Sequence, residues 1–277
     1  MISMRFCKIS VLFKSKNKPP YFIGSQLRGA LGYALKDVAC IDKSKICQNC
    51  EFYNNCVYYR AFEEKNSYHK YRLDFELNKP YYDFNLYVFD DECEYVFDYI
   101  SAIHKMLTEF GIGENREIIN DFSIYVNDEK IYQNNHFYQL ENYIDNINLN
   151  TFSKNIELIL LTPLRIKKNN VFIRDMNIEL LDIINSIQKR YSFIYNQTNF
   201  KINLEGKIVS KNLSYQELNR KSNRQNTKMQ LGGLIGTIKI QDLNHQTYKL
   251  LKIGEYIGVG KQCVFGLGKI IIKEENE

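Results

Sequence analysis

The order of strand-like and helix-like segments constrains this chain of 277 residues more strongly than any other feature. Runs of β-branched and aromatic residues indicate strands, and apolar residues at three- and four-residue spacing indicate helices. In the first half these patterns predict, in order, a strand at 4–14, a helix at 21–39, strands at 70–77 and 82–90, a helix at 94–110 and a hairpin at 122–133. The resulting order is β-α-β-β-α-β.

The second half repeats this order in pattern, though not in residue identity. Its segments predict a strand pair at 156–173 around Thr162-Pro163, a helix at 176–195, strands at 200–210 and 231–240, a short helix at 247–257 and a last strand at 268–273. Two tandem ferredoxin-like (RRM-like) modules of the α+β class are the simplest architecture for such a repeat. The Asn-rich stretch 142–155 is interpreted as a linker, so the predicted domains are 1–148 and 149–277.

The first predicted helix carries a single apolar stripe. Leu27, Leu31 and Leu35 recur at four-residue spacing, which places them on one face of a helix. Ser25 lies just before this stripe, and its side-chain oxygen is expected to cap the first turn.

Four of the seven cysteines cluster in an insert at 40–56 of the first half. Thiols are reduced in the cytoplasm, so a tight cluster favours a metal site over disulfides. Cys47 and Cys50 are separated by two residues and fit one zinc ion, and Cys40 and Cys56 would complete a tetrahedral thiolate site. Four sulfur ligands leave no open position, so the expected zinc is structural and no catalytic metal is expected. Free buried thiols and an iron–sulfur cluster are the alternatives.

Composition excludes several classes of protein. The chain is 44% hydrophobic and 25% charged, which is typical of a globular protein rather than a disordered or fibrous one. No apolar run approaches the roughly 18 residues that cross a bilayer, and the first ten residues lack the apolar segment of a secretion signal. A cytoplasmic protein without a membrane partner is therefore expected. The net charge of +5 permits a polyanionic partner without requiring one.

The C-terminal stretch 254–268 holds five of the 14 glycines. Glycine allows backbone N–H groups to approach a phosphate closely, and Lys261 and Lys269 would add positive charge. The spacing matches neither a Walker loop nor a dinucleotide-binding fingerprint. A glycine-rich β-turn explains the spacing as well as a ligand loop does.

A second feature of the second half is a basic tract at 218–241, which contains no Asp or Glu. Its cations are Arg220, Lys221, Arg224, Lys228 and Lys239. A solvated loop is the usual explanation for such a run. A surface that follows the phosphates of a nucleic acid is the functional interpretation.

These segments together resemble one family. The glycine-rich C-terminus resembles the signature loop of the CRISPR-associated endoribonucleases that cut precursor repeat RNA, within the RAMP superfamily. Residues 27–32 resemble the first helix of that family, and Cys47-x-x-Cys50 with Cys56, Tyr58 and Phe62-Glu63 resembles the cysteine insert of one large branch. Three further segments fall in the family's order: Gly111-Ile-Gly113, Thr162-Pro163-Leu164-Arg165, and Met229 with Leu231-Gly232-Gly233.

The resemblance implies metal-independent cleavage of RNA. The ribose 2′-hydroxyl attacks the adjacent phosphate and leaves a 2′,3′-cyclic phosphate and a free 5′-hydroxyl, which requires a base, an acid and cations around the phosphorane. Many relatives of this branch carry a His just before the Val-Gly-Lys of the terminal loop, where this chain has Gly258; others use a Tyr on the first helix and a nearby His. The catalytic candidates are therefore Tyr33, His69 and Lys261.

The resemblance also implies an RNA-binding surface. The expected RNA-binding residues are Arg28 on the first helix, Arg220, Lys221, Arg224 and Lys228 in the basic tract, and Gly258, Gly260, Phe265, Gly266, Gly268 and Lys269 in the terminal stretch. The expected ligand is CRISPR repeat RNA, cut within the repeat to give mature guide RNA. Other subunits of a CRISPR effector complex are further candidate partners.

Two other functions fit the sequence. A catalytically weak or inactive RNA-binding RAMP subunit of an effector complex would account for Gly258 at the position of the missing His. A zinc-dependent enzyme built on the cysteine insert is disfavoured, because four thiolates with no nearby carboxylate or His leave no site for a hydrolytic water.

Overall fold

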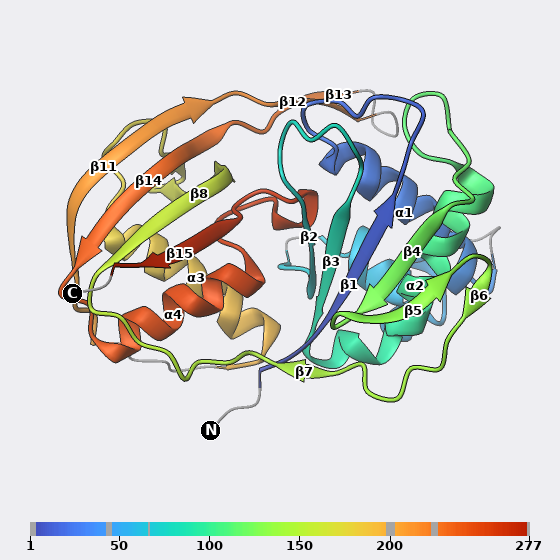
Figure 1. Ribbon diagram of the computed structural model, residues 1–277, viewed down its shortest axis with the longest axis horizontal. Coiled ribbons are helices and arrows are strands. Elements are labelled where there is room, and N and C mark those ends of the chain that lie inside the picture. The colour runs from blue at the N-terminus through green and yellow to red at the C-terminus, as the bar shows by residue number, and fades with distance from the viewer. Residues whose placement is uncertain (1–3, 43–45, 66, 198–202, 223–226, 276–277) are drawn as a thin grey trace. The chain divides into compact units, whose positions relative to one another are not determined.

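The computed structural model describes residues 4–42, 46–65, 67–197, 203–222 and 227–275. The chain forms two compact units, Met1–Asn146 and Ile147–Glu277. Each unit consists of an antiparallel sheet and a pair of helices (Figure 1). Within the described ranges, every helix is too short or too polar to cross a membrane.

Unit 1 has a β-α-β-β-α-β core with additional strands at its end. Its regular elements are β1 (Arg5–Phe13), α1 (Gly24–Ala39), β2 (Tyr71–Asp74), β3 (Phe84–Phe89), α2 (Val96–Lys105), β4 (Phe122–Val126), β5 (Glu129–Gln133), β6 (His136–Phe137) and β7 (Asp145–Asn146). The strand order is β2-β3-β1-β4-β5-β6, and β7 pairs with β1. Three short helical turns, Cys47–Asn49, Tyr53–Asn55 and Tyr59–Glu63, form the cysteine insert between α1 and β2.

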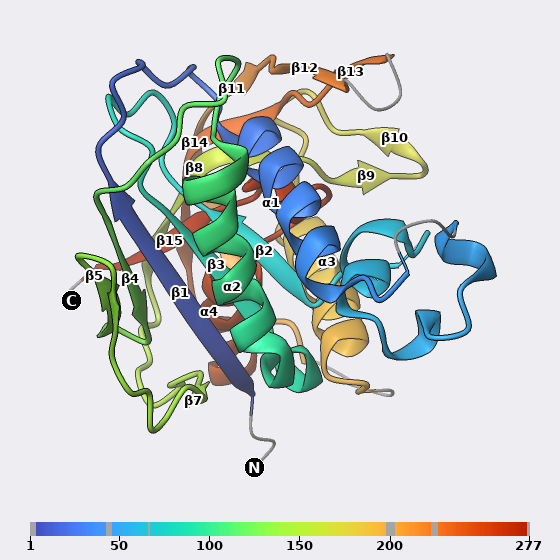
Figure 2. The same cartoon turned by 90° about the vertical axis from the view of Figure 1, so that its right-hand side faces the viewer.

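Helices α1 and α2 lie side by side on one face of the unit 1 sheet (Figure 2). The predicted stripe of Leu27, Leu31 and Leu35 is confirmed, because each of these side chains is at most 1% exposed. Lys105 on α2 forms an ion pair with Asp37 on α1, at 2.7 Å between Nζ and Oδ2. Apolar burial therefore holds the helices on the sheet, and a half-exposed ion pair joins them at the edge.

Unit 2 repeats the order of unit 1. Its elements are β8 (Ile156–Leu164), β9 (Lys167–Lys168), β10 (Val171–Phe172), α3 (Leu180–Ile194), β11 (Lys207–Gln216), β12 (Asn219–Ser222), β13 (Thr227–Gln230), β14 (Gly233–Gln241), α4 (His245–Ile257) and β15 (Ile270–Glu274). The main sheet runs β11-β14-β8-β15, and β9–β10 and β12–β13 form separate hairpins. In both units the second and third core strands lie on one side of the first and the fourth lies on the other. The fold is therefore mixed α/β with antiparallel sheets.

Helix α1 begins differently from the prediction. The expected cap by Ser25 is wrong, because the helix starts at Gly24 and no side chain caps it. The Leu27 N–H donates to the Ile23 carbonyl at 3.0 Å, so the chain is already helical before Ser25. Helix α4 does have a side-chain cap, in which the Asn244 side chain accepts from the Thr247 N–H at 2.8 Å.

The predicted strand pair around Thr162-Pro163 is also wrong. Strand β8 continues through this dipeptide to Leu164 and is followed by the short hairpin β9–β10. Proline is tolerated here because the pairing of β8 with β14 is irregular, with a register shift between Leu234 and Gly236. Strand β15 pairs only with the first half of β8, up to Leu160. The second half of β8 is thus left for another partner along that edge.

Candidate functional site

The partner of the second half of β8 is the glycine-rich segment 258–269, here called the terminal loop. The Leu161 N–H donates to the Lys269 carbonyl at 2.9 Å, and the Gly268 N–H donates to the Pro163 carbonyl at 3.1 Å. The Lys269 N–H donates to the Thr162 hydroxyl at 2.8 Å. The terminal loop therefore lies along β8 and extends the sheet edge beyond β15.

The backbone amides of the terminal loop are engaged within unit 2. The Gly258 N–H donates to the Gly254 carbonyl at 2.9 Å and the Gly266 N–H to the Cys263 carbonyl at 2.9 Å. The Gly260 N–H donates to the Ser186 hydroxyl of α3, also at 2.9 Å. These glycines are buried, as is Phe265 at 4% exposure. RNA contact by these residues remains a prediction, and their hydrogen bonds give them a packing role in the fold.

Close backbone packing explains why glycine occupies two positions of the terminal loop. Gly268 has φ 70° and Gly260 has φ 86°, a region that side-chain-bearing residues rarely adopt. A Cβ on Gly268 would overlap the carbonyl oxygen of Val259, and one on Gly260 would lie 2.5 Å from the carbonyl oxygen of Arg165. Neither neighbour can move easily, because both are backbone atoms.

Arg165 joins three segments of unit 2 at the end of β8. Its side chain is 8% exposed and donates from Nη1 to the Gly232 carbonyl at 2.6 Å. Its own carbonyl accepts from the Lys261 N–H at 2.8 Å. Burial lowers the pKa of the guanidinium, which still keeps its charge because an arginine pKa starts far above neutrality. The Lys261 side chain is exposed on this rigid support.

The basic tract lies on the β12–β13 hairpin, whose strands pair Arg220 with Met229 and Lys221 with Lys228. Arg224 lies outside the described residues. Lys239 is on β14 and pairs with Glu275 at 2.7 Å. Three of the four basic-tract cations predicted to bind RNA, namely Arg220, Lys221 and Lys228, therefore belong to one two-stranded ribbon.

In unit 1 the structure brings Arg28 and His69 to the same tyrosine. Arg28 donates from Nε to the Tyr71 hydroxyl at 3.2 Å, and the His69 ring lies 5.9 Å from the Tyr71 ring. The Arg28 guanidinium also lies 4.8 Å from the centre of the Phe62 ring. A Cβ on Gly32 would lie 2.8 Å from Phe62, so α1 and the insert meet closely at this point. Aromatic rings thus fix the position of a cation on α1.

A hydrogen bond sets the proton position on His69. Its Nδ1 lies 2.9 Å from the Arg60 carbonyl oxygen. A carbonyl only accepts, so Nδ1 must carry the proton, and in the neutral ring Nε2 holds the lone pair. His69 therefore has the tautomer that a general base acting through Nε2 requires. The other three histidines contact aromatic rings: His104 with Tyr132, His136 with Tyr138 and His245 with Phe152.

Tyr33 does not join the Arg28 cluster. The two residues are five positions apart on α1, which separates their directions by about 140° at 3.6 residues per turn. The Tyr33 side chain is 73% exposed. A phenol in this position is accessible to a large ligand, and its exposure shows that it is not packed in the core of unit 1.

The four cysteines of the insert line one cavity of about 170 Å³. Their side chains are half-buried, and the pKa of Cys47 is raised, first by burial and then by the charge of Glu63. Among the residues that the structure describes, no group of three or more Cys, His, Asp or Glu side chains is arranged to hold a metal ion. The thiols therefore share a cavity without forming a coordination cage, and zinc binding remains a prediction.

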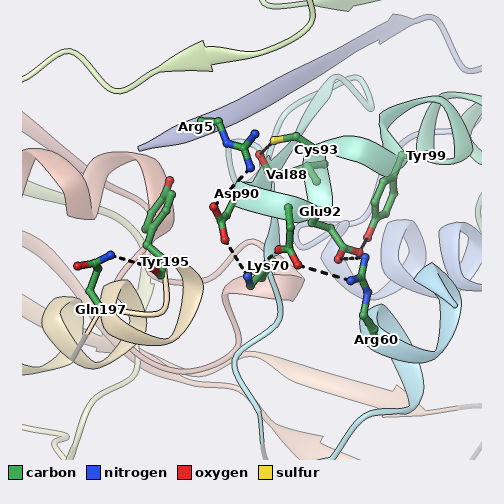
Figure 3. Close-up of polar contacts among 11 residues, drawn as sticks. Arg5, Arg60, Lys70, Val88, Asp90, Glu92, Cys93, Tyr99, Tyr195 and Gln197 are labelled. Atoms are coloured by element: carbon green, nitrogen blue, oxygen red, sulfur yellow. Dashed lines mark hydrogen bonds and ion pairs between the residues drawn. The ribbon is translucent and has the colours of Figure 1, made fainter. Parts of the chain in front are cut away.

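A buried ion pair fixes the insert to the rest of unit 1 (Figure 3). Arg60, in the last turn of the insert, binds Glu92 at 2.9 Å, and the Glu92 side chain is 4% exposed. The Tyr99 hydroxyl of α2 donates to the same carboxylate at 2.9 Å. Burial raises the pKa of Glu92, and the Arg60 charge opposes that rise. Lys70 binds the neighbouring Asp90 and Asp91 at 2.9 and 2.6 Å, and its positive charge offsets part of the negative charge of this turn.

Sequence reasoning misses two residues that organise these sites. The sequence patterns assign Tyr71 only to a strand and Arg165 only to a motif. Both residues are buried, and their polar partners, Arg28 for Tyr71 and Gly232 for Arg165, come from distant parts of the sequence. No periodicity marks such a residue.

The fold is similar to those of several solved CRISPR-associated proteins. A Cas6 product complex is similar at a TM-score of 0.58 and 13% identity, over 98% of this chain and 100% of that chain. Thermus thermophilus Cas6 is similar at a TM-score of 0.56 and 11% identity, over 99% and 100%. A RAMP protein described as binding different RNA substrates has a TM-score of 0.53 and 14% identity, over 98% and 100%.

Family models give the more specific result. The model of the CRISPR-associated endoribonuclease Cas6 matches residues 158–270, and a model described as an N-terminal domain matches residues 3–143. Residues 158–270 of this chain therefore belong to the family of the CRISPR-associated endoribonuclease Cas6. No curated protein matches it in sequence.

The packing of the terminal loop predicts a large effect of one methyl group. Gly268→Ala should lower the free energy of unfolding by about 3 kcal/mol, because it combines a positive φ with overlap of a backbone carbonyl. Gly29→Ala is the matched control, since it lies in α1 with open space around it and should raise stability by about 0.5–1 kcal/mol. Urea denaturation measures both. Equal effects of the two substitutions would show that the terminal loop is not tightly packed.

The buried ion pair predicts a pH-dependent defect. Arg60→Ala should lower the free energy of unfolding by about 3 kcal/mol at neutral pH, because it leaves the Glu92 carboxylate buried and unpaired. The folded-state pKa of Glu92 lies above its unfolded value of about 4.3, so its protonated form stabilises the fold at low pH and this contribution is lost as pH rises. The defect should therefore shrink near pH 4 and be partly rescued by adding Glu92→Gln. A defect that is constant between pH 4 and 7 would contradict this account.

Proposed function

We propose that this protein cuts precursor CRISPR RNA within the repeat to give mature guide RNA. The ribose 2′-hydroxyl at the cut loses its proton and bonds to the adjacent phosphorus, while the bond from phosphorus to the next 5′-oxygen breaks and that oxygen takes a proton. The products are a 2′,3′-cyclic phosphate and a 5′-hydroxyl, and the reaction needs no metal. The observation that carries this proposal is the match of residues 158–270 to the Cas6 endoribonuclease model.

The fold supports the proposed function. Each unit has the strand order of a ferredoxin-like module, and we propose that the chain is a tandem pair of such modules. Similar structures include a Cas6 substrate mimic complex and a RAMP protein described as binding different RNA substrates. We infer the same class of ligand, CRISPR repeat RNA, for this chain.

We assign the catalytic roles from the side-chain environments. His69 acts as the general base through Nε2, because its Nδ1–H is committed to the Arg60 carbonyl. Within unit 1, Arg28 is the cation proposed to stabilise the charge on the phosphorane, and its position is fixed by Tyr71. Within unit 2, Lys261 is the candidate for the same role, and its backbone is held by the Arg165 carbonyl. Tyr33 is exposed on a different face of α1 from Arg28, so the proton transfer at the leaving oxygen is not assigned to it at this cluster and its catalytic role stays a prediction.

RNA binding is assigned to cations rather than to the glycine amides. The exposed Lys261 and half-buried Lys269 lie within the terminal loop, whose glycine N–H groups already donate to protein acceptors. The ribbon that carries Arg220, Lys221 and Lys228 adds further positive charge. Such contacts predict binding that weakens steeply with salt.

The enzyme claim is tested with purified protein, its own repeat RNA and EDTA near neutral pH. A single cut is expected, with products that carry a cyclic phosphate and a 5′-hydroxyl. His69→Ala should slow single-turnover cleavage by about 10²–10⁴-fold with little change in Kd, and Lys261→Ala should lose more cleavage than binding. His136→Ala, at an exposed position of β6, is the matched control and should retain the wild-type rate.

The outcomes separate the enzyme from a non-cleaving subunit. Tight binding of the repeat without any cut would overturn the enzyme claim and identify an RNA-holding RAMP subunit. Cleavage that EDTA abolishes, in a protein that remains folded, would overturn metal independence. If His69→Ala cuts normally, a different group is the base.

We also propose that the cysteine insert binds one structural zinc ion. Cys40, Cys47, Cys50 and Cys56 line a common cavity, and thiolate is a preferred zinc ligand. Because the side chains do not form a cage in this structure, binding would require them to converge, which ties zinc to the order of the insert.

Elemental analysis of the purified protein should find one zinc per chain. Removing it with a strong chelator should lower Tm, because the metal contributes folding free energy. Cys47→Ser should lose the metal and lower Tm to the same value, while Cys263→Ser, outside the insert, should retain the metal. A metal-free protein with an unchanged Tm would show that the thiols are simply half-buried side chains.

A further inference from the structure

The hairpin β9–β10 of unit 2 carries a cluster of positively charged side chains that have no part in the proposed cleavage reaction. The hairpin and the segment after it line an open groove of about 1120 Å³. The cations that line this groove are Lys167, Lys168, Arg174 and Lys211. The groove surface (167–175 with Lys211) is therefore strongly basic, with Asp175 and Glu179 as its acidic residues.

Three of the four cations that line the groove surface form no ion pair with the described residues. Lys168 is paired with Glu179 at 3.0 Å. Lys167, Arg174 and Lys211 form no ion pair with any residue in the described part of the chain. Lys167 lies 4.9 Å from the Phe172 ring and Arg174 lies 5.5 Å from the Tyr215 ring. Lys211 donates to the Met176 carbonyl at 2.7 Å. Two cations beside aromatic rings, with a third cation nearby, suit a ligand that carries several negative charges and flat groups.

The tip of the hairpin presents amide side chains. Asn169 and Asn170 have φ values of 51° and 63°, which are those of the tight two-residue turn that joins twisted strands. Both residues are exposed, and the next residue, Val171, is 69% exposed. Asparagine amides both donate and accept, so this tip offers hydrogen bonds to the edge of an unpaired base.

Arg165 fixes the groove surface to the terminal loop. Its guanidinium lies 4.1 Å from the centre of the Phe172 ring, and its carbonyl accepts from the Lys261 N–H at 2.8 Å. One buried arginine thus contacts the hairpin through its side chain and supports Lys261 through its backbone. Within unit 2, the groove surface is therefore rigidly connected to the residue assigned to the phosphorane.

We propose that the groove surface binds unpaired nucleotides of the repeat RNA next to those contacted by Lys261. This inference rests on the proposed function. Single-stranded RNA is favoured over a duplex because the surface combines phosphate-binding cations with amides and an aromatic ring, and an aromatic ring stacks on the face of a base only where that base is unpaired. In an A-form duplex the major groove is too deep and narrow for side chains to read.

The test is a binding titration by fluorescence anisotropy at several salt concentrations, with a single-stranded repeat RNA and a fully paired RNA of equal length. The double variant Lys167→Ala/Arg174→Ala should weaken single-strand binding by about tenfold and reduce the salt slope by about 1.4, or about 0.7 for each phosphate that the variant no longer neutralises. Lys249→Ala/Lys273→Ala, which removes two exposed cations of the same unit, is the matched control and should change neither value. A circular dichroism melt of each variant checks folding.

Photocrosslinking of the wild-type protein gives a test that does not depend on any variant. A repeat RNA with single 4-thiouridine substitutions should crosslink to a peptide within 165–175. Absence of that crosslink at every position, together with equal Kd and salt slope in the two double variants, would overturn the inference. A loss for paired RNA as large as that for single-stranded RNA would overturn the preference for unpaired nucleotides.

Failure of this inference and of the proposed function are distinguishable. If the wild type cuts the repeat and the groove variant binds like its control, the enzyme claim stands and the groove surface has no RNA role. If the groove variant loses binding while the wild type never cuts, the groove surface binds RNA in a protein that is not a nuclease.

Discussion

Backbone hydrogen bonds between the terminal loop and the second half of β8 hold together the candidate site of unit 2. The Gly268 N–H donates to the Pro163 carbonyl and the Lys269 N–H to the Thr162 hydroxyl. The terminal loop therefore lies along the part of β8 that does not pair with β15. Glycine is required within the terminal loop, because a Cβ on Gly268 would overlap the Val259 carbonyl and one on Gly260 would meet the Arg165 carbonyl. Arg165, directly after β8, then contacts both Lys261 and the β9–β10 hairpin. Its carbonyl accepts from the Lys261 N–H, and its guanidinium lies over the Phe172 ring. Repeated glycines are thus explained by steric need, before any ligand is considered.

Unit 1 uses a different kind of contact to position its candidate residues. Side chains rather than backbone meet between α1 and the insert, with Phe62 lying against Gly32 and the Arg28 guanidinium. The buried pair of Arg60 and Glu92 then fixes the end of the insert, and the Arg60 carbonyl orients His69. One short helical turn therefore both anchors the insert and sets the tautomer of the proposed base. Such coupling makes the order of the insert important for His69.

Much of the fold could be predicted from the sequence because its signals are periodic. The stripe of Leu27, Leu31 and Leu35 and the alternating strands determine which faces are buried, and the order of elements then limits the topology. The ends of elements were less predictable. Strand β8 runs through Pro163 because its pairing with β14 is irregular there and its pairing with β15 has already ended. A hairpin with two-residue strands such as β9–β10 has no period to detect.

The sequence by itself determined which residue types are available and in what order: two rounds of the same strand–helix pattern, a set of cysteines close together, and a glycine-rich end with lysines. Only the tertiary structure decided which of them meet. It assigned the glycine amides to protein acceptors, joined Arg28 and His69 through Tyr71, and placed Arg165 between Lys261 and a basic hairpin. The reason is physical: local patterns report the face a residue presents, whereas a site depends on contacts between residues far apart in the chain, and those arise only when the sheets and helices pack.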